Sequence, residues 1–469
     1  MNEKKGANTV KLNYKRTFIV GLAFFSICAF WQLYDHVVPL MLKYTFHLED
    51  TLAGGVMALD NVLALFLLPL FGMLSDKTRT RWGRRMPYIV IGGFAACAMM
   101  MTIPLVNDFA MQEALTLPGG YTWHSLATFP LFIAALGLTL LLMATYRSPA
   151  VALMPDVTVK PLRSKANAVI NLMGAVGGII ILGLTKVMLP GKPKEDAGLT
   201  SYSPDYFPIF WCCMAIMALA TLILLWRVNE PKLTSQMAED AKRWGVADEP
   251  QPAAEDGKAP ASAKMERPVR RSMLFLLTSV ALWFMGYNAV TTAFSKYCVE
   301  RFGLGADDSA LILMIAQAAA IVSYIPVGML SGRIGRKKCI LGGVALLAVS
   351  FGIGGLFTSF SPFLYVLFIT AGIAWAAINV NSYPMVVEMA QGSIVGRFTG
   401  YYYTASMAAQ VATPVLSGAA LQHIGYATLF PYGALFVALS FVTMLFVRHG
   451  DAKPQPPKSK LEVFDAMDD

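Results

Sequence analysis

The chain has 469 residues, of which 56% are hydrophobic and only 14% are charged, and its mean hydropathy is +0.54. Soluble domains carry about 25% charged residues, so this composition excludes a soluble globule and favours an integral membrane protein. The formal net charge is +9, but the Lys and Arg residues cluster in short connections between apolar segments. There they set membrane orientation, and we do not expect them to bind nucleic acid.

The first 16 residues are polar and basic, with no pattern of a cleavable signal peptide, so we expect the N-terminus to lie in the cytoplasm. Six apolar segments follow, each with roughly the 20 residues needed to cross a hydrocarbon core about 30 Å thick. These segments lie at residues 17–42, 51–74, 86–106, 126–153, 165–188 and 206–227.

A polar segment rich in Pro, Ala, Glu and Lys, at residues 229–268, interrupts this pattern, and we expect a flexible cytoplasmic tether rather than a small folded domain. A second set of six apolar segments lies at residues 272–297, 308–331, 338–359, 362–387, 397–421 and 427–447. The predicted organisation is a six-helix half (1–228), the tether (229–268), a second six-helix half (269–450) and a cytoplasmic tail (451–469).

The connections between the apolar segments alternate in their content of basic residues. Residues 107–127 and the turns around Phe360 and His423 contain neither Lys nor Arg, whereas the connections at 160–165, 227–271 and 333–338 are rich in them. Because basic connections lie on the cytoplasmic side, both termini are predicted to be cytoplasmic. The predicted external loop with Lys192 and Lys194 departs from this rule.

The most informative loop is Gly72-Met-Leu-Ser-Asp-Lys-Thr-Arg-Thr-Arg-Trp-Gly-Arg-Arg85, which has a reduced repeat at Gly328-Met-Leu-Ser-Gly-Arg-Ile-Gly-Arg336. The first segment of each half also repeats a pattern, because Tyr34-Asp35 precedes Lys43-Tyr44 at the spacing by which Tyr287-Asn288 precedes Lys296-Tyr297. Such repeats indicate a duplicated transporter fold, with the substrate site between the halves near mid-membrane.

These motifs resemble those of the major facilitator superfamily over essentially the whole chain. The first loop together with Tyr146-Arg-Ser-Pro149 and Phe284-Met-Gly-Tyr-Asn288 is similar to the sucrose/proton symporters and the related glycoside–pentoside–hexuronide cation symporters. The resemblance implies an all-α membrane protein with the major facilitator fold, in which twelve transmembrane helices form two six-helix halves with pseudo-twofold symmetry. The second loop has Gly332 where the first has Asp76, so the two intracellular gates need not be equally strong.

Asp35 and Asp60 are predicted to couple transport to a cation. Each lies roughly 10–14 Å from the external end of its helix, counting about 1.5 Å per residue. Two carboxylates at matching depth are suited to sharing a proton or holding a Na⁺ ion, and ionisable groups at that depth are expensive unless they face a cavity or one another. The alternative is that each carboxylate only completes a polar network near the surface.

Arg147 lies roughly 13 Å inside the cytoplasmic end of its helix, and its planar donor group suits a carboxylate or sugar hydroxyls. Sugar sites combine aromatic faces with amides and charged groups. The predicted substrate-binding residues near the axis are Trp31, Gln32, Tyr34, Arg147, Tyr287, Asn288, Trp375 and Asn379. The alternative for each is ordinary helix packing, and Asn167, Asn171, Gln317 and Gln410 carry weaker signals.

A cytoplasmic gate is predicted from charged residues at helix ends, because ion pairs there can lock one conformation and break in another. We expect Asp76 to pair with Arg84 and Arg85, and Asp156 with Arg163. Glu388 and Arg397 are the counterparts in the second half. The alternative is that these residues only set topology.

The predicted function is secondary active transport in the plasma (inner) membrane by a multi-pass monomer, with proton-coupled uptake of a sucrose- or maltose-like glycoside by alternating access. The alternatives are a sodium-coupled glycoside or hexuronide symporter and an exporter of amphipathic compounds. No enzyme activity, cofactor or metal site is expected, and no ATP-binding loop of the GxxxxGK[ST] type is present in the sequence. A membrane receptor or scaffold is disfavoured because embedded Asp and Arg residues would then have no role.

Overall fold

The computed structural model describes residues 12–117, 121–159, 162–196, 199–243, 267–389 and 395–451. The first half contains α1 (Tyr14–Leu40), η1 (Met41–Thr45), α2 (Asp50–Lys77), α3 (Met86–Met100), α4 (Thr102–Thr116), η2 (Trp123–Ser125), α5 (Thr128–Asp156), α6 (Arg163–Met188) and α7 (Phe207–Arg227). The second half contains α9 (Arg267–Tyr297), η4 (Cys298–Phe302), α10 (Ala306–Ile334), α11 (Arg336–Gly354), α12 (Phe363–Glu388), α13 (Val395–His423), η6 (Tyr426–Thr428) and α14 (Leu429–Leu445).

Within the described ranges, 11 helical stretches are long and apolar enough to cross a membrane, with α3 and α4 counted as one stretch. A twelfth long helix, α13, carries Tyr, Thr, Ser and Gly residues that lower its hydropathy, and it packs against α2. The predicted all-α fold with two six-helix halves is confirmed. The predicted loop at 107–127 differs in detail, because α4 continues the helix to Thr116.

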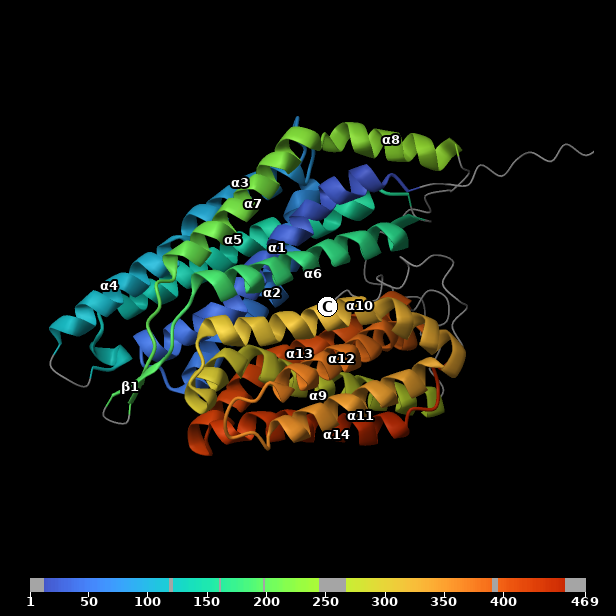
Figure 1. Ribbon diagram of the computed structural model, residues 1–469. Coiled ribbons are helices and arrows are strands. Elements are labelled where there is room, and N and C mark those ends of the chain that lie inside the picture. Colours follow the sequence, from blue (N-terminus) through green and yellow to red (C-terminus); the bar gives the residue numbers. More distant parts are fainter. Residues whose placement is uncertain are drawn as a thin grey trace, which may run out of the picture.

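Each half has its own core, and the halves meet mainly along two helix pairs. One cluster of buried side chains comes almost wholly from residues 20–228 and another from residues 273–447. Figure 1 shows the two bundles side by side, the first coloured blue to green and the second yellow to red. Across the interface α2 packs on α13, and α6 packs on α10. Gly54 faces the backbone of Pro414, and Gly418 faces the backbone of Asp50, with no room for a Cβ at either glycine, which allows this close helix contact.

Two ends of the bundle are distinguished by short elements. A β-hairpin formed by β1 (Lys194–Asp196) and β2 (Leu199–Ser201) lies at one end, which we call the hairpin side. Helix α8 (Glu230–Arg243) lies at the other end, which we call the α8 side (Figure 1).

Helix α8 is a departure from the expected flexible tether. Its residues Met237 and Ala241 are buried against Val159 and Leu162. Leu233, Met237 and Ala241 recur every four residues in a polar segment, and this spacing gives an amphipathic helix its one apolar face. The first part of the segment therefore docks on the first half, while residues 244–266 lie outside the described residues.

Candidate functional site

Three of the predicted site residues surround one small recess between α1, α2 and α5. Trp31, Asp60 and Arg147 line it together with apolar side chains, and it has room for about one water molecule. The guanidinium carbon of Arg147 lies 5.5 Å from the centre of the Trp31 ring, which is the geometry of a cation–π contact. The structure thus brings a cation, a carboxylate and an aromatic ring from three helices together.

Asp35 belongs to the same charged region. Its carboxylate and that of Asp60 are close enough to interact electrostatically, and Asp60 also interacts with Arg147. Asp60 Oδ1 accepts a hydrogen bond of 2.7 Å from Asn61 Nδ2. Among the residues that the structure describes, none forms an ion pair with Asp35, Asp60 or Arg147. Within the described residues, the charges of Asp35, Asp60 and Arg147 are therefore not neutralised by structural ion pairs.

Several buried polar atoms near the interface of the halves have no hydrogen-bond partner within the described ranges. They are Trp31 Nε1, Tyr34 Oη, Gln317 Oε1 and Asn379 Oδ1. Buried polar atoms are normally hydrogen-bonded to protein or water. Four such atoms on α1, α10 and α12 therefore indicate a place where water or a polar ligand supplies the missing bonds.

The second half contributes an aromatic pair at similar depth. Tyr287 on α9 and Trp375 on α12 stack with ring centres 3.6 Å apart and planes inclined by 3°. Phe284 packs edge-on against Trp375. Asn288, the repeat counterpart of Asp35, follows Tyr287 in the sequence and is half-buried. Its backbone oxygen accepts a hydrogen bond of 2.6 Å from Thr292 Oγ1. Gln32 lies elsewhere, beside Gly178 on α6.

A network that the sequence analysis missed closes the hairpin side. Asp50 at the start of α2 binds Lys43 Nζ at 3.2 Å, Lys296 Nζ at 2.7 Å and the Tyr426 hydroxyl at 2.7 Å. Lys296 and Tyr426 belong to the second half, so this carboxylate ties the halves together. Lys43 and Lys296 occupy equivalent positions in the internal repeat. This equivalence was the sequence signal that could have identified the network.

Further polar contacts between the halves surround this network. Tyr44 Oη donates to Glu300 Oε1 at 2.8 Å, and Lys186 Nζ lies 2.8 Å from Asp307 and 2.6 Å from Asp308. Tyr202 Oη accepts a hydrogen bond of 2.7 Å from the backbone N–H of Ala306. Burial raises the pKa of Tyr202 to about 12, so this contact stays neutral at physiological pH.

The remaining inter-half hydrogen bonds of the hairpin side come from His36 and Gln422. His36 Nε2 lies 3.0 Å from the backbone oxygen of Ala306. The Gln422 amide oxygen accepts from the backbone N–H of Thr51 at 3.1 Å. The hairpin side is therefore closed by both α2–α13 and α1–α10 contacts.

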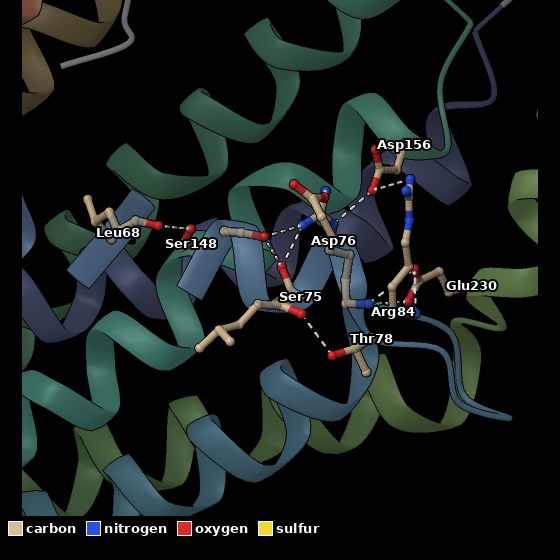
Figure 2. Close-up of polar contacts among 11 residues, drawn as sticks. Leu68, Ser75, Asp76, Thr78, Arg84, Ser148, Asp156 and Glu230 are labelled. Atoms are coloured by element: carbon tan, nitrogen blue, oxygen red, sulfur yellow. Dashed lines mark hydrogen bonds and ion pairs between the residues drawn. The ribbon is translucent and has the colours of Figure 1, made fainter. Parts of the chain in front are cut away.

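The predicted gate residues of the first half meet on the α8 side, as Figure 2 shows around Asp76, Arg84 and Asp156. Arg85, which is 6% exposed, forms an ion pair with Asp76 and another of 2.9 Å with Asp156. Arg84 lies 3.1 Å from the same Asp156 oxygen. The expected Asp156–Arg163 pair is not formed, because Asp156 at the end of α5 faces the loop before α3. Arg163 instead donates to the backbone oxygen of Thr158 at 3.1 Å.

Glu230 is a second residue that the sequence analysis missed. Its carboxylate accepts hydrogen bonds of 2.9–3.0 Å from the backbone N–H groups of Arg84, Arg85 and Met86. These amides open α3 and have no partner within that helix, and a negative charge there also meets the positive end of the helix dipole. Glu230 thus fastens α8 to the first half (Figure 2).

The second half has a smaller cluster on the α8 side. Arg336 forms an ion pair with Glu388, and the backbone N–H of Lys337 donates to Asp451 Oδ1 at 2.9 Å. The repeat position of Asp76 is Gly332, so the carboxylate partner comes from α12 instead. The side chain of Arg397 lies outside the described residues.

Comparison with known proteins connects this arrangement to a family. The sequence model of the Major Facilitator Superfamily matches residues 20–328 and 307–465. An uncharacterized symporter of Synechocystis sp. is 28% identical over 151 residues, which are 31% of this chain and 26% of that protein. A sucrose transport protein of Arabidopsis thaliana is 26% identical over 226 residues, which are 47% of this chain and 35% of that protein. The chain thus spans about a quarter to a third of the length of these relatives.

Solved structures share the fold at low sequence identity. The nucleoside transporter NupG is 14% identical, with a TM-score of 0.63 over 93% of this chain and 100% of that one. A bacterial homologue of the iron transporter ferroportin, in its inward-facing state, is 12% identical, with a TM-score of 0.66 over 93% of this chain and 99% of that one.

Proposed function

We propose that this chain, which belongs to the major facilitator superfamily, couples the uptake of a sucrose- or maltose-like glycoside to proton entry by alternating access. The observation that carries the proposal is the meeting of Asp60 and Arg147 beside Trp31, with Asp35 within electrostatic range of Asp60 and none of the three in an ion pair in the described part of the chain. The printed names of the sucrose transport relatives support the substrate class.

The orientation of the protein in the membrane is inferred from charge asymmetry. The α8 side carries the basic loop at residues 77–85, so the positive-inside rule assigns it to the cytoplasm. The hairpin side is then external, and the Asp50 network is a closed external gate. We further propose a plasma (inner) membrane location, cytoplasmic termini and a monomeric state.

In this mechanism a proton from the external side binds the Asp35–Asp60 pair when the external gate is open. Neutralising one carboxylate removes repulsion between the two and lowers the cost of moving them through a closed state. Arg147 and the Tyr287–Trp375 stack then bind the sugar through hydroxyl groups and an apolar ring face. Opening toward the cytoplasm releases the sugar, and the proton leaves the carboxylate there.

Two alternatives use the same residues. Carboxylate oxygens are also suitable ligands for Na⁺, and Arg147 is suited to the carboxylate of a hexuronide, so a sodium-coupled glycoside or hexuronide symporter is the second candidate. The aromatic lining also suits an exporter of amphipathic compounds.

Uptake by the purified protein in liposomes tests the proposal. Labelled sucrose or maltose is expected to accumulate when the outside is made acidic, and a protonophore is expected to abolish accumulation. Accumulation that requires a sodium gradient and ignores pH would establish the second candidate. Absence of uptake for every glycoside under both gradients would refute glycoside symport.

A further inference from the structure

Gln317 on α10 carries a polar atom that the described chain leaves without a partner. Its Oε1 is buried and accepts no hydrogen bond, although buried side-chain oxygens normally have one. The residue lies in the middle of α10, which packs against α6 across the interface of the halves. A polar ligand in the interface is one source of the missing hydrogen bond.

The internal repeat shows how Gln317 differs from its counterpart in the first half. Asn61 on α2 and Gln317 occupy the same position relative to the Gly-Met-Leu-Ser motif of their halves. Asn61 uses its amide to bind Asp60 at 2.7 Å. The residue before Gln317 is Ala316, which offers no carboxylate. Gln317 is one methylene longer than Asn61, and its Nε2 has no adjacent carboxylate of the kind that Asn61 Nδ2 binds.

A second amide, from the first half, lies close to the first. A Cβ built on Gly178 of α6 would be 2.9 Å from Gln317 Nε2 and 3.4 Å from Gln32 Oε1. The two side chains thus converge over the backbone of α6, where an added Cβ would displace the end of the Gln317 side chain. Neither is hydrogen-bonded to the other in the described structure, so both retain free donors and acceptors.

Helix α12 places the aromatic pair close to this point. Gly372 has no room for a Cβ because it faces the backbone of Ala316 and Ala320 on α10. Trp375 follows Gly372 by one helical turn and stacks on Tyr287. An apolar ring face and a pair of neutral amides therefore lie at neighbouring levels of the interface.

We propose that Gln317 and Gln32, over Gly178, form a subsite for adjacent hydroxyl groups of a neutral glycoside. An amide offers both a donor and an acceptor, as vicinal hydroxyls require, and neutral amides do not compensate a ligand charge. Because one amide comes from each half, a sugar bound here contacts both halves and favours the state in which they are close. This inference rests on the proposed glycoside transport and narrows it to uncharged sugars at this subsite.

Sugar binding to the purified full chain tests the subsite, measured as the sugar concentration that gives half of the maximal thermal stabilisation. The probes are sucrose, maltose and glucuronate, and the variants are Gln317→Leu, Gln317→Met and Gly178→Ala. Gly183→Ala is the matched control on the same helix, because its Cβ would make only an ordinary contact of 3.6 Å with Met314.

For whichever neutral sugar stabilises the wild type, each of the three variants is expected to need about tenfold more of it, the equivalent of one lost hydrogen bond. Gly183→Ala is expected to match the wild type, and all variants are expected to melt normally without sugar. Stabilisation of the wild type with unchanged affinity in every folded variant would overturn the subsite alone. No stabilisation of the wild type by sucrose or maltose, whether or not glucuronate stabilises it, would overturn the transport of a sucrose- or maltose-like glycoside, and the subsite with it.

Discussion

Asp50 and Lys296, which belong to different halves of the chain, form an ion pair of 2.7 Å in which the two side chains are only 5% and 6% exposed. Lys43, the repeat counterpart of Lys296, binds the other oxygen of the same carboxylate at 3.2 Å. One acidic side chain thus bridges two symmetry-related cations. Breaking a buried ion pair by removing one partner is strongly destabilising, about 3–5 kcal/mol, because the other charge is left uncompensated.

Asp50→Asn is therefore expected to open the hairpin side. Spin labels on the exposed positions Leu115 and Leu356, one in each half, report the separation by electron–electron distance measurement in a background without the native cysteines. We expect a population with longer distances to become dominant. Asp108→Asn removes a carboxylate of the same half that forms no ion pair within the described residues, and as the control it is expected to leave the distribution unchanged.

A double-mutant cycle of Asp50→Asn with Lys296→Met separates the pair from its surroundings. Asp50→Asn alone leaves the buried Lys296 charge without its carboxylate, whereas removing both charges does not, so the double variant is expected to be closer to the wild type than Asp50→Asn alone. Additive effects of the two substitutions on the distance distribution would mean that the pair does not hold this gate.

The Asp50 network also marks a limit of reasoning from sequence. The duplicated fold followed from segment lengths, basic loops and the repeated Gly-Met-Leu-Ser motif, because each is a local property of the chain. Asp50 opens α2 and is indistinguishable in sequence from an acidic residue that favours a helix N-terminus. Its partners come from η1, the last turn of α9 and η6, and the apolar pattern does not encode how these distant segments meet.

The central site was predicted only in part, because sequence gives the depth of a residue along its helix but not the direction of its side chain. Depth counting placed Asp35 and Asp60 on neighbouring helices, and the structure brings their charges within electrostatic range. Arg147, whose partner the sequence left open between a carboxylate and sugar hydroxyls, interacts with Asp60 and the Trp31 ring. Side-chain direction around a helix axis depends on packing against neighbours, and depth alone does not determine it.

Asp35→Asn is expected to abolish sugar accumulation driven by a pH gradient while retaining exchange of labelled for unlabelled sugar. The neutral amide keeps the shape of the side chain, so sugar passage continues, but no proton is bound and released at this position. Both activities are measured with the same liposomes. The contrary result, accumulation equal to that of the wild type, would remove Asp35 from the coupling role and leave Asp60 as the candidate.

Arg147→Lys is expected to raise the KM for sugar about 10- to 100-fold, with a smaller effect on the maximal rate. A lysine keeps the positive charge but loses the planar donor group and its contact with Trp31. Hydrogen bonds to charged groups contribute about 1.5–3 kcal/mol, which is the origin of the expected range. An unchanged KM would mean that Arg147 has a structural role. Trp31→Phe keeps an aromatic ring but removes the unpaired indole N–H, and it is expected to raise the KM less than Arg147→Lys does.

Glu230→Gln tests whether α8 is fastened by its carboxylate. The glutamine keeps one acceptor for the amides of Arg84, Arg85 and Met86 but loses the charge at the N-terminus of α3. We expect a loss of about 1 kcal/mol of unfolding free energy, since caps and charges at helix N-termini contribute amounts of this order. Thermal unfolding in detergent measures the loss as a lower Tm. Glu239→Gln is the same substitution at an exposed position of the same helix, and it is expected to leave Tm unchanged. Equal effects of the two variants on Tm would show that net charge, rather than the cap on α3, determines stability.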